Sequence, residues 1–110
     1  MHEYSLTCDI LKSVLEYSQG REIKKIVLVI GEMSSVIDES VKLYWELLAE
    51  NTLAEKAQLE FKRIEGYFIC KECGHIFPVK HSDFRCPMCG QQKFRIDERS
   101  KSFYIESIEI

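Results

Sequence analysis

Two closely spaced pairs of cysteines constrain the fold of this chain more than any other feature. Each pair is a Cys-x₂-Cys motif, and the four residues are Cys70, Cys73, Cys86 and Cys89. Each motif can present two thiolates from one tight turn, so two motifs complete a tetrahedral site for a single ion. Gly74 and Gly90 directly follow the motifs and supply the backbone freedom that such turns need. The spacing predicts a structural zinc site, Zn(II), on the four cysteines.

Other interpretations of the cysteines are less favoured. A redox dithiol of the thioredoxin type would occur once, at the start of a helix that follows a strand. A catalytic zinc is disfavoured because four thiolates leave no open position for water. We expect His75 and His81 to be solvated side chains rather than zinc ligands. Cys8 lies at the edge of an expected apolar helix face, and we assign it no chemical role.

The rest of the sequence predicts an α+β fold. Amphipathic helices are expected at 4–18 and 38–52, and strands at 24–30, 59–65 and 102–110. Two helices laid on one face of a small three-stranded sheet would form a compact unit. Because the third strand follows the cysteines, they belong to a zinc-ribbon-like module inserted between the second and third strands. We therefore expect an α+β domain of residues 1–65 plus 102–110, and a zinc-binding module of residues 66–101.

Apolar side chains support these assignments. The first helix is expected to bury one side consisting of Leu6, Ile10, Leu11, Val14, Leu15 and Tyr17. The second helix is expected to turn Val41, Tyr44, Trp45 and Leu48 inward. The module has Phe68, Phe77, Phe84 and Phe94, too few for an independent core. The metal must therefore contribute much of the module's folding free energy.

Composition limits the compartment and the partners. The net charge is −3 and is unevenly spread: residues 66–101 carry +3 and the remainder −6. Nucleic acid is therefore a poor partner for the larger part and a weak one for the module. No apolar run approaches the roughly 20 residues of a membrane helix, and the N-terminus lacks the pattern of a secretory signal. We expect a cytoplasmic protein, where disulfides rarely persist.

The chain starts with the sequence MHE, which can bind a metal ion. The Met1 amine, the His2 backbone nitrogen and the His2 imidazole are consecutive and can wrap one ion in fused chelate rings. Nitrogen donors in a plane suit Ni(II) or Cu(II). The backbone nitrogen or carboxylate of Glu3 is one candidate for a fourth donor, and a side chain from elsewhere in the fold is another. Taken alone, MHE remains compatible with a chain end that has no role.

Several motifs together resemble those of the HypA family of nickel metallochaperones. The MHE start leads into an amphipathic helix, and the next strand ends in I30-G31-E32. A second helix then precedes the double Cys-x₂-Cys module, and the chain closes on an S-I-E-I strand. The resemblance covers the whole chain, and the MHE start and the cysteine motifs are its most specific parts.

The resemblance implies a set of metal ligands and partners. Nickel, Ni(II), would bind through His2 with the adjacent Met1 and Glu3, and zinc would occupy the four cysteines. The cargo would be delivered to the large subunit of [NiFe]-hydrogenase with a GTPase partner of the HypB kind. Some relatives also serve urease and its accessory proteins. Asp38 is a weaker candidate nickel ligand, and a helix N-cap is its favoured interpretation.

We therefore favour a binding protein that carries a metal, with no membrane or nucleic-acid partner, over an enzyme. No Ser/His/Asp set, phosphate loop or pair of catalytic carboxylates stands out in the sequence. One alternative is a nucleic-acid-binding zinc ribbon, with Lys71, Arg85 and Lys93 among its cations and Phe84 and Phe94 beside them. Another is a structural adaptor without a second metal. The sequence leaves open whether the chain is a monomer or a homodimer, and whether hydrogenase or urease is the recipient.

Overall fold

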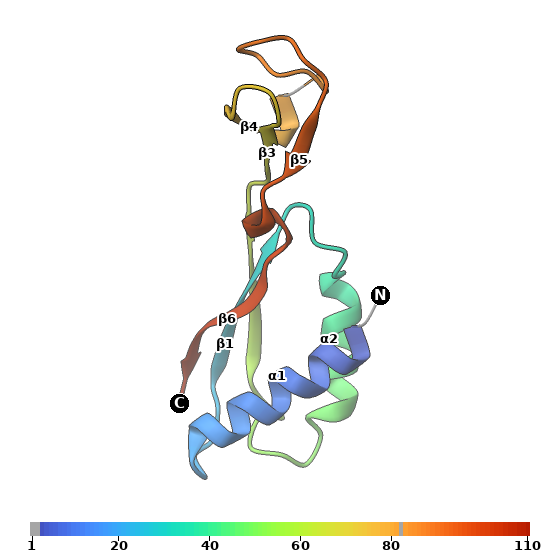
Figure 1. Ribbon diagram of the computed structural model, residues 1–110. Helices are drawn as coiled ribbons and strands as arrows, with labels where there is room; N and C mark the ends of the chain where they lie inside the picture. The colour runs from blue at the N-terminus through green and yellow to red at the C-terminus, as the bar shows by residue number, and fades with distance from the viewer. Residues whose placement is uncertain (1–2, 82) are drawn as a thin grey trace. The chain divides into compact units, whose positions relative to one another are not determined.

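Two helices lie in the N-terminal half of the chain and short strands predominate after them, and the α+β fold class predicted from the sequence is confirmed. The computed structural model describes residues 3–81 and 83–110 (Figure 1). The elements are α1 (Glu3–Ser18), β1 (Lys25–Gly31), α2 (Asp38–Leu48), β2 (Gln58–Ile64), β3 (Tyr67–Cys70), β4 (Ile76–Pro78), the 3₁₀ turn η1 (Val79–His81), β5 (Phe94–Ile96), the 3₁₀ turn η2 (Glu98–Lys101) and β6 (Phe103–Glu109). They form two three-stranded sheets, ordered β2-β1-β6 and β4-β3-β5.

The described residues divide into two compact units. Unit 1 comprises residues 3–29, 35–62 and 103–110, and unit 2 comprises residues 30–34, 63–81 and 83–102. Unit 2 thus begins slightly before the expected module and also takes in the segment after β1. The exact domain limits given by the sequence stay a prediction. None of the described helices is long and apolar enough to cross a lipid bilayer.

The core of unit 1 lies between the two helices and one face of the sheet. Its buried residues include Ile10 and Val14 from α1, Val41 and Trp45 from α2, and Leu28 from β1. The strands β2 and β6 add partly buried residues to the same core, namely Leu59, Phe61, Phe103, Ile105 and Ile108. The helices also meet through an edge-to-face pair of Tyr4 and Tyr44, with ring centroids 5.4 Å apart. Burial of this shared apolar face is what holds the unit together.

Two details of the helices differ from the sequence-based expectation. Tyr17 is 62% exposed, and the small polar side chain of Thr7 is fully buried instead. Helix α2 ends at Leu48 rather than at residue 52, because Asn51 adopts a left-handed conformation with φ of 63°. The Thr52 hydroxyl then donates to the Ala49 carbonyl at 2.6 Å and competes with the helical pattern.

Unit 2 contains the second sheet, whose central strand is β3. Strand β3 pairs antiparallel with β4 through Phe68 opposite Phe77, and with β5 through Phe68 opposite Ile96. A small cluster lies on one side of this sheet, with Phe68, Cys70, Phe77 and Cys86 buried and Val79, Phe94 and Ile96 packed against them. Two of the four buried members are cysteines, so the cysteine motifs are part of the module's core.

A set of hydrogen bonds within unit 2 ties the end of β1 to the two ends of the module. The Gly31 amide donates to the Ser102 carbonyl, and the Met33 amide to the Ser100 carbonyl, both at 2.8 Å. The Gly66 amide donates to Oε1 of Glu32 at 2.7 Å. A Cβ at Gly31 would lie only 2.2 Å from the Ser100 carbonyl oxygen. Glycine is therefore required there for the close approach of two backbones.

We expect Gly31→Ala to lower the free energy of unfolding by about 1–3 kcal/mol, because neither backbone can yield without breaking these bonds. Gly20→Ala is the matched control. Gly20 has φ of 87° but nothing within 4 Å of an added Cβ, so its cost comes from backbone strain alone, about 1 kcal/mol. Chemical denaturation of both variants provides the measurement. Equal stability of Gly31→Ala and the native chain would contradict the close packing at Gly31.

Candidate metal centre

The two cysteine motifs fold into matching turns. In the first, the Gly74 amide donates to the Cys70 carbonyl at 3.0 Å; in the second, the Gly90 amide donates to the Cys86 carbonyl at 2.9 Å. Both glycines have φ near 75°, a conformation that side chains other than glycine rarely adopt. The first cysteine of each turn forms a second backbone hydrogen bond: the Cys70 amide donates to the His75 carbonyl, and the Cys86 amide donates to the Gln91 carbonyl.

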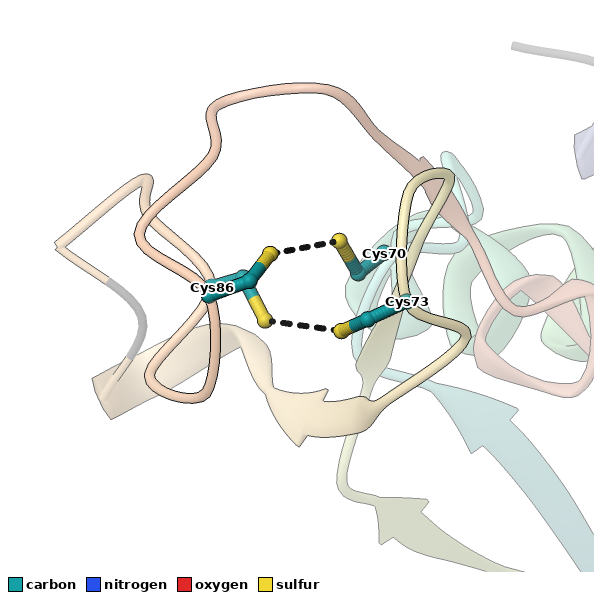
Figure 2. A group of neighbouring side chains, drawn as sticks. Cys70, Cys73 and Cys86 are labelled. Carbon is teal, nitrogen blue, oxygen red and sulfur yellow. Dashed lines mark hydrogen bonds between the residues drawn. The ribbon is translucent and has the colours of Figure 1, made fainter.

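These turns bring the four sulfur atoms together. The Sγ atoms of Cys70 and Cys89 lie 3.6 Å apart, as do those of Cys73 and Cys86 (Figure 2). All four sulfur atoms lie within 4.8 Å of one another. Four thiolates at the usual Zn–S bond length of about 2.3 Å would be about 3.8 Å apart. The cluster therefore fits a tetrahedral ion with only small adjustments, and four sulfur donors favour zinc.

Backbone amides favour the ionised form of two of the four thiols, those of Cys70 and Cys86. The backbone amides of Cys73 and Glu72 lower the pKa of the Cys70 thiol to about 7, although burial opposes the shift. Burial also opposes ionisation of Cys86, yet the amides of Cys89 and Met88 lower the pKa of that thiol below its usual value. The Met88 amide lies 3.4 Å from the Cys86 sulfur. The first cysteine of each turn is thus favoured as a thiolate, whereas burial and the neighbouring sulfurs raise the pKa of Cys73 and raise that of Cys89 to about 12. Metal binding must therefore displace protons from these two thiols.

The other cysteine and the histidines have different surroundings. Among the described residues, the group able to hold a metal contains the four motif cysteines and no histidine. The His75 ring instead stacks on Phe77 with a ring-to-ring distance of 6.2 Å. Cys8 is a half-buried residue of α1 and does not join the cluster. The side chain of His81 lies outside the described residues.

Of the expected nickel ligands, Met1 and His2 lie outside the described residues, whereas Glu3 is described. Glu3 is the first residue of α1 and is 8% exposed. Its Oε2 atom accepts a hydrogen bond from the Ile37 amide at 3.1 Å. Ile37 is the N-cap of α2 and has no capping side chain of its own. A carboxylate at this helix end is favoured by the helix dipole, so Glu3 joins the starts of α1 and α2.

Asp38 is not the helix N-cap that we favoured from the sequence. It is the first residue of α2, and its Oδ1 accepts from the neighbouring Glu39 amide at 3.0 Å. Because Glu3 contacts Ile37, the structure brings Glu3 and Asp38 to the same end of unit 1. The sequence pattern held no signal for this link, since Glu3 and Ile37 are 34 residues apart.

Comparison with known proteins identifies the family. The family model described as "Hydrogenase/urease nickel incorporation, metallochaperone, hypA" matches residues 1–110. The chain belongs to the HypA family. A hydrogenase maturation factor HypA from Caldanaerobacter subterraneus subsp. tengcongensis is 44% identical over 113 aligned positions, covering 100% of this chain and 99% of that protein. A HypA from Pyrococcus furiosus is 30% identical, covering 100% and 96%.

Solved structures of HypA proteins share the fold. The solution structure of one HypA protein superposes with a TM-score of 0.74 and 26% identity, covering 100% of this chain and 96% of that one. The solution structure of the nickel metallochaperone HypA from Helicobacter pylori gives a TM-score of 0.72 at 24% identity, with 100% and 97% covered. The family resemblance inferred from MHE and the cysteine motifs is therefore confirmed.

Removing one motif cysteine tests the metal centre. We expect the native chain to bind one zinc, and Cys73→Ser to weaken zinc binding by about 100-fold or more, because the site loses a thiolate. Without zinc, the amide signals of β3, β4 and β5 should lose their dispersion, while the helices of unit 1 persist. Metal analysis and NMR provide the measurements. Cys8→Ser is the matched control and should keep its zinc; full retention by Cys73→Ser would contradict the assignment.

Proposed function

We propose that this chain is a nickel metallochaperone that binds Ni(II) at its N-terminus and delivers it during the maturation of [NiFe]-hydrogenase. The observation that carries this proposal is the match to the HypA family model over residues 1–110. The description of that model names both nickel incorporation and metallochaperone activity. In this role Ni(II) is the cargo, and the protein acts as a carrier rather than as a catalyst.

The chemistry of the cysteine cluster supports a nickel site that is separate from the zinc site. We assign structural zinc to Cys70, Cys73, Cys86 and Cys89, a set that gives an ion four donors and leaves no open position. A closed site of this kind suits a permanent structural ion, whereas a cargo ion has to be reached by the recipient. Nickel should therefore use the nitrogen donors of Met1 and His2, which suit Ni(II).

The roles of the two acidic residues follow from their contacts. The Glu3 side chain is buried against the start of α2, so it is suited to fixing the N-terminal end of α1. We propose that Glu3 contributes to the nickel site through its backbone nitrogen or a carboxylate oxygen, next to His2 in the chain. Asp38 lies one residue beyond the amide that Glu3 binds and is half-buried. It is the candidate for an additional carboxylate ligand.

The proposed partners follow from the same maturation pathway. We propose the large subunit of [NiFe]-hydrogenase as recipient and a GTPase of the HypB kind as the protein that acts with this chain. Urease and its accessory proteins are a second possible recipient, because the family description names urease as well. A reducing cytoplasm is the proposed compartment, since it keeps the cluster cysteines available for zinc.

A nickel titration of the zinc-loaded, untagged protein tests the proposed function. We expect one Ni(II) per native chain and a loss of affinity of about 100-fold or more in His2→Ala, because a direct ligand is removed. Zinc content should not change. Calorimetry gives the stoichiometry and affinity, and visible absorption reports the coordination geometry.

Matched variants distinguish the proposed nickel ligands from residues of the same type that should not bind nickel. His81→Ala removes another histidine and should bind nickel as the native chain does. Asp38→Asn tests the carboxylate ligand against Asp9→Asn, an exposed aspartate of α1. Equal nickel binding by the native chain and His2→Ala, or no binding by either, would remove the N-terminal site from the proposal.

Nickel binding should also depend on pH. The imidazole of His2 must be neutral to bind, and an ordinary histidine has a pKa of about 6.5. As the pH falls from about 7 to about 5, protons compete for this ligand and for the backbone nitrogens, so nickel should be released. Equilibrium dialysis across this range provides the measurement. Unchanged nickel affinity at about pH 5 would contradict nitrogen ligation by His2.

A further inference from the structure

The pairing register of the second sheet separates its residues into two faces. Side chains directly opposite one another on neighbouring strands share a face, and successive residues alternate between faces. The inner face carries Phe68, Cys70, Phe77, Phe94 and Ile96 and forms the module's core. The other face, called the outer face here, carries Tyr67, Ile69, Ile76, Pro78 and Arg95. The core of unit 2 thus uses only one of the two faces.

The outer face has an unusual composition for a solvent-facing sheet. Antiparallel sheets commonly alternate apolar residues inside with polar residues outside. Here four of the five outer side chains are apolar or aromatic, and Ile76 on the edge strand β4 is 48% exposed. Ile69, on the central strand, lies opposite both Ile76 and Arg95. The face is therefore an apolar strip with one guanidinium at its β5 side.

The charged side chain of this face is Arg95, while at the Tyr67 end the Tyr67 hydroxyl donates to Oε2 of Glu65 at 3.4 Å. Arg95 is exposed, and among the described residues it forms no ion pair. Two of the module's four acidic residues are already paired, because Asp97 contacts Arg99 at 2.6 Å and Glu72 contacts Lys93 at 3.9 Å. Residues 66–101 have seven Lys and Arg against four Asp and Glu, which leaves a net charge of +3.

We propose that the outer face is a docking surface for an acidic protein segment that carries apolar side chains beside its carboxylates. The apolar side chains would cover Ile69 and Ile76, and a carboxylate would pair with the Arg95 guanidinium. Arginine is well suited to this contact because it presents a rigid fork of donors to a carboxylate. This inference concerns the zinc module alone and does not depend on nickel binding at the N-terminus.

Charge complementarity distinguishes this occupant from others. A second copy of the chain would bring a second Arg95 to the apolar strip, and the two like charges would repel each other. Single-stranded nucleic acid would also match the positive charge, and it would need aromatic faces for its bases to stack on. The outer face offers a single aromatic ring, that of Tyr67, among aliphatic side chains. A segment with both apolar and acidic side chains fits this composition better.

The experiment uses the full zinc-loaded chain and a short fluorescein-labelled peptide in which leucine alternates with glutamate. We expect saturable binding by fluorescence anisotropy, with amide shift changes gathered at Tyr67, Ile69, Ile76 and Arg95. Arg95→Glu should weaken binding by about fivefold or more, because an attractive charge becomes repulsive. Ile76→Ser should weaken it as well. Lys12→Glu makes the same charge change on α1 and is the matched control.

Other outcomes would overturn the proposal. These are no binding of the glutamate peptide, equal binding of a peptide with lysine in place of glutamate, or equal affinity of Arg95→Glu and Lys12→Glu. Binding of oligouridine with shift changes on this face, in place of the acidic peptide, would assign the face to nucleic acid. Zinc content confirms that each variant is folded. If Arg95→Glu loses zinc, Arg95→Gln replaces it and should weaken peptide binding about twofold to threefold.

Discussion

The fold of unit 2 depends on the close approach of four cysteine sulfur atoms, which can bind one metal ion together. The sheet of this unit has short strands, and among its described residues the core cluster has four buried members, of which Cys70 and Cys86 are two. Such a core is too small to offset the loss of chain entropy without help. Metal binding supplies the missing free energy, because the thiolates form a site only when both turns are folded. The matching hydrogen bonds of the Gly74 and Gly90 amides stabilise those turns in the conformation that brings the sulfur atoms together.

The proposed nickel site would differ in kind from the cysteine cluster. The cysteine cluster is complete, sulfur-rich and tied into a core, which are properties that retain an ion. The N-terminus offers nitrogen and oxygen donors beside Glu3, whose carboxylate connects α1 with the amide of Ile37. Few protein ligands and easy access favour transfer. The proposed carrier would thus combine a permanent ion that stabilises its fold with a second site from which the cargo can leave.

Local sequence patterns predict much of this structure. The features that they do not predict depend on contacts between residues far apart in the chain. The cysteine spacing, the two helices and the positions of β1, β2 and β6 along the chain depend on periodicity and turn chemistry, which a single sequence displays. The short strands β3, β4 and β5 were not predicted. The contact of Glu3 with Ile37 joins residues far apart in the chain, so no local pattern indicated it. The end of α2 was predicted too late because the left-handed Asn51 and the Thr52 hydroxyl interrupt an otherwise helical pattern. The approach of Gly31 to Ser100 likewise appears only in three dimensions.

X-ray absorption at the nickel and zinc edges of one doubly loaded sample tests the separation of the two sites most directly. We expect four sulfur neighbours around zinc at about 2.3 Å, and only nitrogen and oxygen neighbours around nickel. The zinc spectrum should be the same before and after nickel is added. Sulfur in the nickel shell, or loss of sulfur from zinc when nickel binds, would contradict two independent sites and place the cargo on the cysteines.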